Sequence, residues 1–416
     1  MLTWLKIAFR NIIKNSRRSV YTIIAIALGF AAINVFAGFT SYIFTTIQTN
    51  IIHIYGLGHL SLFKEGYRQE GLMDPASYLI NKTELKELIE ILDSYPEVIL
   101  VSPQLQVSGM VSNGKASTSF LAWGAVPSHV QFFQDRAGGA LAAIDFYNGR
   151  SLEDDISYGV GLSSGLSSIM DLQAGDRGMV ITSTVDGMIN ALDIEVFQTF
   201  EAPLEGLNNS LMRVPLSFAQ SLYDTDSVAR VSVLLDNDSH TEAVKSRLAD
   251  VLPQAGLTME AATWQELGAN YRKVKEMFEV IFIFLFAIIL IIIVMSIVNT
   301  ISISIMERTR EIGTLRVLGM KKSGIIRLFA LESALLGIGG CLLGIFLTVI
   351  SWWAVILLDI TWIPPQFSIP IPLEIHLLLS NLAFIFIFLV LLSTISAILP
   401  ARKAARKNIV DALGHV

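Results

Sequence analysis

The apolar positions of this chain are gathered into four long runs rather than spread evenly. The runs cover roughly residues 20–43, 277–305, 328–358 and 376–399. Each one reaches the roughly 20 predominantly apolar residues that a helix needs to cross a bilayer core. A stretch of mixed polarity, long enough for one or two folded domains, separates the first run from the second. The pattern predicts a membrane protein with four transmembrane α-helices and a large domain inserted between helices 1 and 2.

Composition supports this interpretation. Hydrophobic residues make up 53% of the 416 residues and charged residues 16%, whereas soluble domains are usually about 25% charged. The first run is unlike a cleaved signal peptide, because no charged residue occurs from Ser19 to Phe63 and the apolar stretch exceeds about 7–15 residues. The only cysteine, Cys341, lies in the third run, so the chain can form no intrachain disulfide.

The distribution of cations predicts the orientation. Half of the 30 Lys and Arg residues lie in three short segments that flank the spans. These cations are Lys6, Arg10, Lys14, Arg17 and Arg18, then Arg308, Arg310, Arg316, Lys321, Lys322 and Arg327, then Arg402, Lys403, Arg406 and Lys407. The positive-inside rule places the three segments in the cytoplasm. Residues 44–275 are rich in acids, so we expect them outside, together with the connection 359–375.

The predicted organisation follows from these two patterns. The segments are a cytoplasmic amphipathic helix at 1–18, spans at 19–47, 275–305, 327–358 and 376–400, an extracytoplasmic domain at 48–274, a cytoplasmic segment at 306–326, an extracytoplasmic loop at 359–375 and a cytoplasmic tail at 401–416. In the first helix Lys6, Arg10 and Lys14 recur every four positions and line one face. We expect this helix in the membrane interface; a basic tail that only sets topology is the alternative.

The second span is longer than a bilayer requires. Met277 to Ile305 would extend roughly 43 Å at 1.5 Å per residue. The surplus is expected to project beyond the hydrocarbon and to transmit movement between the two sides. Tilt within the membrane is the alternative explanation.

Small and polar residues mark further positions within the spans. The third span carries Ser333, Gly337, Gly340 and Gly344 at helical spacing, which predicts close helix–helix contact within the chain or between two subunits; tolerated transmembrane glycine is the alternative. Three intramembrane polar residues are candidates for function, namely Asn34, Asn299 and Glu332. Glu332 lies close to Arg327 in sequence, so a purely structural role at the interface is equally open.

The inserted region has mixed patterning that predicts an α+β domain. Segments such as NKTELKELIEILDSY and TEAVKSRLADVL have helical apolar periodicity, and VILVSP, VARVSVLL and IEVFQTF have the composition of strands. We expect two lobes, with an inner lobe at about 105–210.

Two motifs in this region resemble catalytic signatures only superficially. GMVSNGKA has the glycine and lysine spacing of a phosphate loop, but Ala116 stands where a hydroxyl must bind magnesium, so a glycine-rich hairpin turn is predicted. GLSSG places Ser163 at the centre of a nucleophile-elbow pattern, but no alternating βαβ series surrounds it, and a helix start or tight turn is predicted. The six histidines have no metal-ligand spacing. We therefore expect no catalytic residues and no metal site.

A charged strip, IMERTREIGTLRVLGMKKSGIIR at 305–327, joins the second span to the third. As a helix that begins at Glu307, it has Ile312, Leu315 and Gly319 along one side, and Gly319 predicts its C-terminal end. The ion pairs that spacing predicts are Glu307 with Arg310 and Arg308 with Glu311. We expect a short amphipathic helix at the membrane surface; a solvated positive-inside loop is the alternative.

The same strip carries a family resemblance. MERTREIGTLRVLGMKKSGIIRLFALESALLGIGGCLLG resembles the characteristic segment of MacB/FtsX-type ABC transporter permeases, where such a run forms the coupling helix that leads into the third transmembrane helix. The matching residues are Glu307, Arg308, Thr309, Arg310, Glu311, Ile312, Gly313, Arg316, Gly319 and Glu332. VGLSSGLSSIMDLQAGDRGMVIT and ATWQEL are similar to segments of the lipoprotein-releasing (Lol-type) branch.

The resemblance implies a mechanism and partners. Two permease subunits, identical or paralogous, would bind a dimer of a separate ABC ATPase that holds ATP and Mg, so this chain would need no cofactor and would not be an enzyme. The residues expected to contact the ATPase are Glu307, Arg308, Arg310, Glu311, Ile312, Leu315, Arg316 and Gly319. Membrane lipids are further partners, and nucleic acid is not expected. The location would be the bacterial cytoplasmic (inner) membrane, with both termini in the cytoplasm.

Three roles fit such a subunit. Extraction or release of lipoproteins is the first, because the inserted region resembles the Lol-type branch more than other branches. Export of an amphipathic compound or peptide with an adaptor, as in MacB-like pumps, is the second. Regulation of a cell-wall hydrolase, as by FtsX proteins, is the third.

Overall fold

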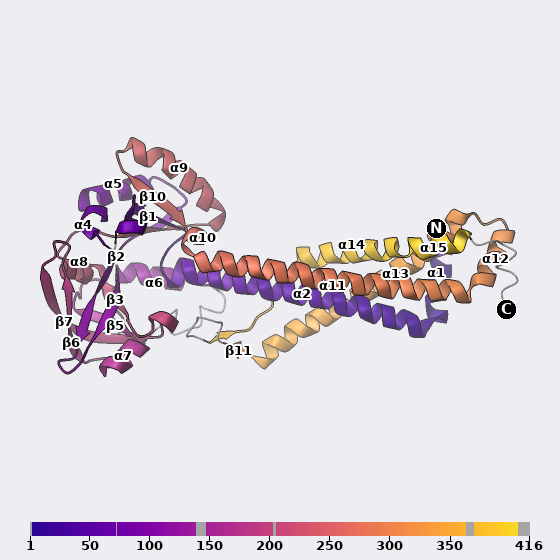
Figure 1. The fold of residues 1–416 in the computed structure, drawn as a ribbon, viewed down its shortest axis with the longest axis horizontal. Helices are drawn as coiled ribbons and strands as arrows, with labels where there is room; N and C mark the ends of the chain where they lie inside the picture. The colour runs from indigo at the N-terminus through magenta and orange to yellow at the C-terminus, as the bar shows by residue number, and fades with distance from the viewer. Residues whose placement is uncertain (1, 72, 139–146, 203–204, 363–369, 407–416) are drawn as a thin grey trace. The chain divides into compact units, whose positions relative to one another are not determined.

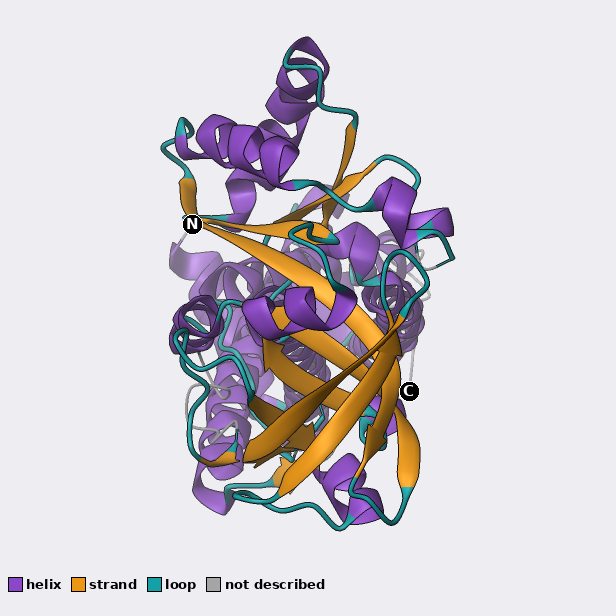
Figure 2. Cartoon of the chain, turned by 90° about the vertical axis from the view of Figure 1, so that its left-hand side faces the viewer, coloured by secondary structure: helices purple, strands orange, loops and turns teal. Residues whose placement is uncertain are grey.

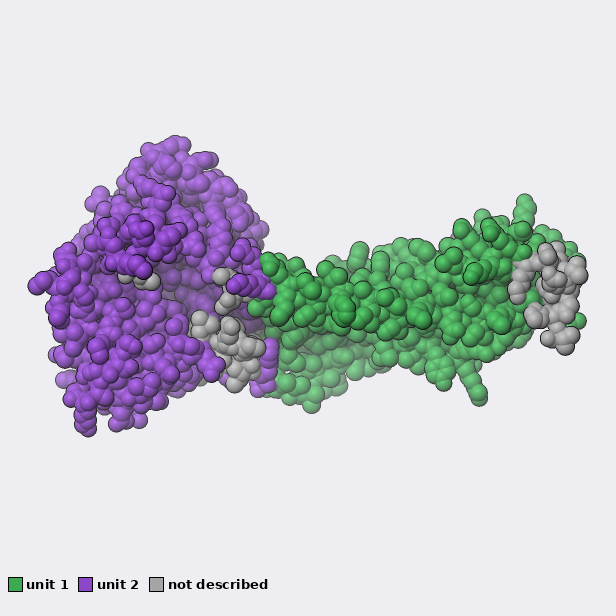
Figure 3. All heavy atoms as spheres, in the orientation of Figure 1, with its two compact units in different colours: residues 1–43, 274–360, 373–416 green, residues 44–273, 361–372 purple. Residues whose placement is uncertain are grey.

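The computed structural model describes residues 2–71, 73–138, 147–202, 205–362 and 370–406 (Figure 1). The chain divides into two compact units, coloured in Figure 3. We call residues 1–43, 274–360 and 373–416 the helical unit, and residues 44–273 and 361–372 the inserted domain.

The helical unit consists of long and short helices (Figure 1). They are α1 (Leu2–Lys14), α2 (Ser16–Thr49), α11 (Ala269–Glu307), α12 (Thr309–Val317), α13 (Lys322–Leu358), α14 (Leu379–Ser396) and α15 (Ile398–Arg406). Among the described residues, four helical segments are long and apolar enough to cross a membrane: Ser16–Ile54, Tyr271–Glu307, Lys322–Leu358 and Leu379–Arg406. The predicted set of four spans, with a large domain inserted between the first and second, is confirmed.

Several helix ends differ from the predicted span limits. The helix of the second span begins at Ala269, before the predicted residue 275, because the four charged residues within 272–276 lower hydropathy without opposing helix formation. The tail predicted from residue 401 begins inside α15, where Ala401, Ala404 and Ala405 are buried. Alanines at helical spacing form a narrow face that packs against α13, and a hydropathy criterion does not detect such a face.

Small residues let α13 pack closely against two neighbouring helices of its own unit. A Cβ added to Gly340 would lie 2.6 Å from Ile26, and one added to Gly344 would lie 2.7 Å from Phe30, both on α2. On the α14 side, a Cβ on Gly337 would lie 2.6 Å from Ser393 Oγ. The Ser333 hydroxyl donates to the Ser393 carbonyl at 2.7 Å. The four small residues therefore pack within one chain.

The inserted domain is built on one large, mainly antiparallel sheet, whose strands are orange in Figure 2. The strand order is β10-β1-β9-β2-β3-β8-β5-β7-β4, and β6 pairs with β2 and β7. The strands are β1 (Leu60–Lys64), β2 (Val98–Ser112), β3 (Ser117–Ala125), β4 (Asn148–Gly149), β5 (Gly159–Ser163), β6 (Arg177–Ser183), β7 (Ile189–Phe200), β8 (Leu211–Pro215), β9 (Arg230–Leu235) and β10 (Met259–Thr263). A separate pair is formed by β11 (Thr361–Trp362) and β12 (Ile371–Pro372).

Helices cover this sheet, as expected for an α+β domain. They are α3 (Tyr67–Glu70), α4 (Pro75–Tyr78), α5 (Lys82–Asp93), α6 (Pro127–Asp135), α7 (Ser164–Met170), α8 (Leu216–Tyr223), α9 (Thr241–Gln254) and α10 (Trp264–Leu267), with a π-helical turn η1 (Asn50–Ile54) after α2 and 3-10 turns η3 (Glu205–Leu207) and η4 (Asp238–His240). The two helices predicted from periodicity are α5 and α9. A capping box starts α5, because the Asn81 side chain accepts from the Glu84 amide and the Glu84 carboxylate accepts from the Asn81 amide.

The predicted two lobes share one sheet. One hydrophobic core includes Leu105, Val107 and Val111 of β2, and a second core packs Val98 and Val101 of the same strand. The predicted boundary near residue 105 therefore falls in the middle of β2 and divides the cores but not the backbone. The fully buried residues of the second core resume at Val228, and the partly buried Leu216 packs against both cores, so the division lies later than the predicted limit near 210. Because one continuous strand, β2, contributes residues to both cores, the composition of the sequence does not change where one core ends and the other begins.

Candidate functional site

A cluster of charged side chains joins five helices of the helical unit around the start of α12. The helix α11 ends at Glu307, and Arg308 interrupts the helical path before Thr309 begins α12. The expected single helix from Glu307 is therefore wrong at its first residues. Because the helix is interrupted, Glu307 and Arg310 lose the geometry of a helical pair. Glu307 instead binds Arg18 of α2, with Nη1 and Oε1 2.6 Å apart.

Arg308 is the centre of the cluster. Its Nη1 donates to Glu332 Oε1 of α13 at 2.9 Å, and its Nε donates to Glu311 Oε2 of α12 at 2.8 Å. The side chains of Arg308 and Glu332 are only 11% and 4% exposed. The Asn11 amide of α1 also donates to Glu332. Glu332 therefore has one structural partner on α1 and another in the turn that precedes α12, and the pair predicted between Arg308 and Glu311 is confirmed.

The electrostatics favour the charged form of Glu311. The hydrogen bond from Arg308 lowers the pKa of Glu311 below its ordinary value, and Lys14 Nζ, 3.3 Å from Glu311 Oε1, acts in the same direction. A carboxylate that is already paired stays ionised at neutral pH. Removing one member of a buried pair is expensive, at about 3–5 kcal/mol, because the other charge is left uncompensated. The cluster therefore holds α1, α12 and α13 in one arrangement.

A glycine terminates α12 as predicted. Gly319 has φ +95°, a conformation that side chains other than glycine rarely adopt. The Met320 amide donates to the Leu315 carbonyl at 3.0 Å and the Gly319 amide to the Arg316 carbonyl at 3.1 Å. These two bonds satisfy the last carbonyls of the helix in a Schellman motif. The backbone conformation at Gly319 thus fixes the direction in which the chain continues from α12 toward α13.

The faces of α12 differ in exposure. Thr309, Ile312 and Gly313 are buried, and Ile312 belongs to the hydrophobic core of the helical unit. Arg308 and Ile312 therefore pack inside the chain and are not surface contacts, because the helix directs its apolar side toward its own bundle. The exposed part ends in two apolar side chains, Val317 at 61% and Leu318 at 78% exposure. Neither was among the expected contact residues.

The remaining expected contact residues lie outside that core. Glu307, Arg310, Glu311 and Gly319 are exposed, and Leu315 and Arg316 are partly exposed. With Val317 and Leu318, they form what we call the α12 surface.

The other polar residues singled out from the sequence are not part of this cluster. The Asn34 amide donates to the Phe30 carbonyl at 2.8 Å, and Asn381 of α14 lies 3.4 Å from Asn34 Oδ1. Asn299 of α11 is exposed. A pair that sequence reasoning missed, Thr22 of α2 and Thr300 of α11, brings two hydroxyls to 2.6 Å.

The superficially catalytic motifs have structural roles in the inserted domain. Asn113 Oδ1 accepts from the Lys115 and Ala116 amides at 2.8 Å, so GMVSNGKA forms the predicted hairpin turn between β2 and β3. Ser163 is the N-cap residue of α7, as predicted, and its hydroxyl donates to the Asn208 carbonyl at 2.8 Å. Within the described residues, no group of three or more His, Cys, Asp or Glu side chains could hold a metal ion.

Comparisons with known proteins give a family match that falls mostly in the helical unit. Residues 283–409, which include α12 and α13, match the family model described as FtsX-like permease C-terminal. The ABC transporter permease YtrF of Bacillus subtilis (strain 168) is 30% identical over 44% of this chain, a match that spans only 42% of YtrF.

Two further relatives are similar over longer stretches. The uncharacterized ABC transporter permease YvrN of Bacillus subtilis (strain 168) is 23% identical over 100% of both chains. The lipoprotein-releasing system transmembrane protein LolC of Neisseria meningitidis serogroup B (strain ATCC BAA-335 / MC58) is 22% identical over 80% of this chain and 82% of that protein.

Proposed function

We propose that this chain, which is an ABC transporter permease of the FtsX type, couples ATP hydrolysis by a separate ATPase to movement of its inserted domain. Four helices able to cross a membrane make it a multi-pass membrane protein. The observation that carries the proposal is the buried Arg308–Glu332 pair, which fixes α12 to α13 while the α12 surface stays exposed. A short helix held in this way can pass a force from a bound partner into the bundle.

The partner we propose is a dimer of a separate ABC ATPase. ATP and Mg would be bound by this ATPase and not by the permease chain. It would contact the α12 surface, where Val317 and Leu318 supply apolar area and Arg310 and Glu311 supply charge. Exposed apolar side chains surrounded by charged ones are typical of a protein interface. A second permease subunit, identical or paralogous, would complete the complex. In this arrangement both termini and α12 face the cytoplasm of an inner membrane.

Chain continuity supports transmission toward the inserted domain. The helix α11 runs without interruption from Ala269 to Glu307, and its last residue precedes Arg308 directly. Its 39 residues would measure about 58 Å at 1.5 Å per residue, against about 30 Å for a hydrocarbon core. Residues at both ends of α11 are therefore part of one helix that exceeds the membrane.

For the cargo, we propose lipoprotein extraction or release. The support is the similarity to LolC over 80% of this chain and the sequence segments that resemble that branch. Export of an amphipathic compound or peptide with an adaptor is the second candidate, because a macrolide export ATP-binding/permease protein is also similar, at 24% identity over 48% of this chain. Regulation of a cell-wall hydrolase is the third, because the family model is FtsX-like.

Purification of the tagged chain from its native membranes, followed by mass spectrometry, tests both levels of the proposal. We expect an ABC ATPase and an acylated protein among the specific partners. A co-purified adaptor would support export instead, and a hydrolase would support regulation. Absence of any ATPase, with the chain shown to be intact and folded, would refute the coupling role itself.

A further inference from the structure

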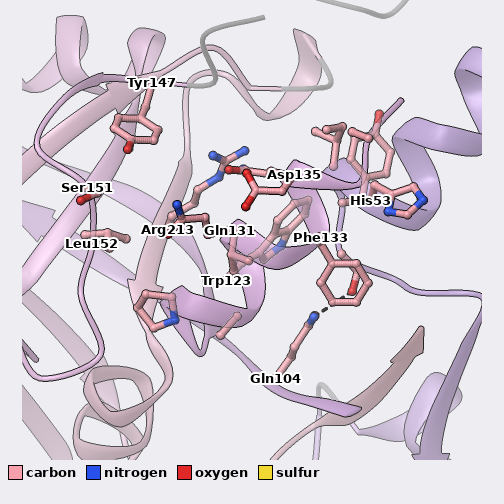
Figure 4. Close-up of a pocket in the computed structure, with 18 of the residues that line it drawn as sticks. His53, Gln104, Trp123, Gln131, Phe133, Asp135, Tyr147, Ser151, Leu152 and Arg213 are labelled. Carbon is pink, nitrogen blue, oxygen red and sulfur yellow. Dashed lines mark hydrogen bonds between the residues drawn. The ribbon is translucent and has the colours of Figure 1, made fainter. Parts of the chain in front are cut away.

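The inserted domain contains a cavity that the coupling role does not use (Figure 4). Its volume is about 570 Å³, and its lining residues come from η1, β2, β3, α6, β7 and β8 and from the segment around Ser151. Small-molecule sites usually measure about 300–1,000 Å³ and combine apolar walls with a few polar groups. The size is therefore suitable for one small ligand.

One cation in this cavity has no anionic partner among the described residues. The Arg213 guanidinium of β8 forms no ion pair within that part of the chain, and it lies over the ring of Phe200, 4.0 Å from the ring centroid. Burial lowers the pKa of Arg213 to about 10, so the group remains charged at neutral pH. Arg213 is partly exposed, and a partly desolvated charge without a counter-ion is unfavourable. A guanidinium offers a fork of donors that fits a carboxylate.

A second polar group in the same lining also has no partner among the residues that the structure describes. Gln198 of β7 is 4% exposed, and its Oε1 accepts no hydrogen bond from them. The same is true of Nδ1 of His53, at another part of the lining. A buried acceptor without a donor costs about 1–3 kcal/mol. A ligand that brings hydrogen-bond donors together with an anion would satisfy these groups.

Aromatic side chains form much of the remaining wall. Tyr55 and Trp123 lie with ring centroids 6.4 Å apart, and Phe133 and Tyr147 also line the cavity (Figure 4). These rings favour a ligand with an apolar body. Asp135 lines the cavity as well, but this residue is exposed, so water screens its repulsion of an anion.

We propose that this cavity binds a small carboxylate with an aliphatic or aromatic body, and that Arg213 binds its carboxylate group. The site lies wholly within the inserted domain, so the inference holds whichever cargo the transporter handles. Gln198 would accept a hydrogen bond from an amide or hydroxyl group of the ligand. An aliphatic carboxylate would indicate a fatty acid or acyl-chain source, and an N-acylated aromatic amino acid would indicate a peptide source.

The test uses the full chain in lipid nanodiscs and saturation-transfer difference NMR. The probes are octanoate and N-acetyl-phenylalaninate, each with its neutral amide as the matched control. We expect saturable binding of at least one acid, with its amide at least tenfold weaker. The acid that binds more tightly identifies the source. Empty nanodiscs measure partition of each probe into lipid.

Variants connect the binding to the cavity. Arg213→Gln should weaken acid binding at least tenfold, whereas Arg177→Gln should not, because Arg177 is 83% exposed and lies outside the cavity. Ser151→Trp fills the cavity from an exposed position and should abolish binding even if Arg213→Gln fails to fold. Equal binding of acid and amide, unchanged binding in Ser151→Trp, or no saturable binding of either acid would overturn the proposal.

Discussion

Arg308 and Glu332 are 24 positions apart in the chain, yet their side chains form a buried ion pair at 2.9 Å. The pair connects Arg308, the residue between α11 and α12, with the first half of α13. Asn11 adds α1 through its hydrogen bond to the same carboxylate. The start of α12 is therefore held by contacts with residues of α1 and α13, and not only by ion pairs within α12.

Breaking this pair from one side should destabilise the chain strongly. Arg308→Met or Glu332→Gln leaves a buried charge or donor unsatisfied, so we expect a loss of about 3–5 kcal/mol for each. The double variant should lose less than the sum of the two single losses, because neither charge is left alone. Thermal unfolding in nanodiscs measures all three.

The control for this cycle is the exposed pair of Lys14 with Glu311, in which the side chains are 70% and 50% exposed. Lys14→Met should change stability by less than about 1 kcal/mol. If the single and double variants at Arg308 and Glu332 give additive losses, the two residues do not interact as the structure describes.

Gly319 should tolerate no side chain, although space is available around it. A Cβ there would meet nothing within 4 Å, but φ is +95°, so the penalty is conformational and amounts to about 1–3 kcal/mol. Gly319→Ala should reduce coupling, measured as ATPase stimulation in the reconstituted complex. Gly319→Pro should be worse, because it also removes the amide that donates to Arg316.

Gly206→Ala is the matched control for Gly319→Ala. Its Cβ would also meet nothing within 4 Å, but its φ is not positive. We expect unchanged coupling and stability in this variant. A loss of coupling as large as that of Gly319→Ala would mean that the backbone conformation at Gly319 is not the cause.

The exposed apolar end of α12 should be required for ATPase binding and not for folding. Leu318→Asp introduces a charge at a side chain that is 78% exposed, so the unfolding temperature should stay within a few degrees of the parent protein. Co-purification of the ATPase should fall at least tenfold. Met188→Asp, at a 70% exposed position in the inserted domain, should leave ATPase binding unchanged; equal losses in both variants would contradict the assignment.

Two adjacent glycines of α13 should respond differently to alanine. At Gly340 the new Cβ would lie 2.6 Å from Ile26 and 3.2 Å from the Ile23 carbonyl, whereas at Gly339 the nearest atom is 3.6 Å away. We expect Gly340→Ala to destabilise by about 1–3 kcal/mol. Gly339→Ala should be close to neutral in the same unfolding measurement. Equal effects would show that α13 and α2 do not pack through Gly340.

Local patterns account for the parts of the fold that the sequence predicted correctly. Apolar runs of this length predict helical spans, because in lipid the backbone N–H and C=O groups must be hydrogen-bonded to each other and a helix pairs them within one segment. Periodicity located α5 and α9, and Gly319 marked the end of α12, because these features depend on residues a few positions apart. Arg308 and Glu311 could be paired for the same reason. The helical interruption at Arg308 was missed, because the residues on either side of it favour helix equally well.

By itself, then, the sequence determined the number of spans, the place of the inserted domain and the family resemblance of residues 306–344. Tertiary structure alone decided that Arg308 and Ile312 face inward, that Asn11 and Arg308 share Glu332, and that Gly340 packs on Ile26. It also brought Arg213 and Gln198 to one cavity from strands that are not adjacent in the sheet. Such contacts join residues far apart in the chain, and their formation depends on how whole elements pack rather than on local composition.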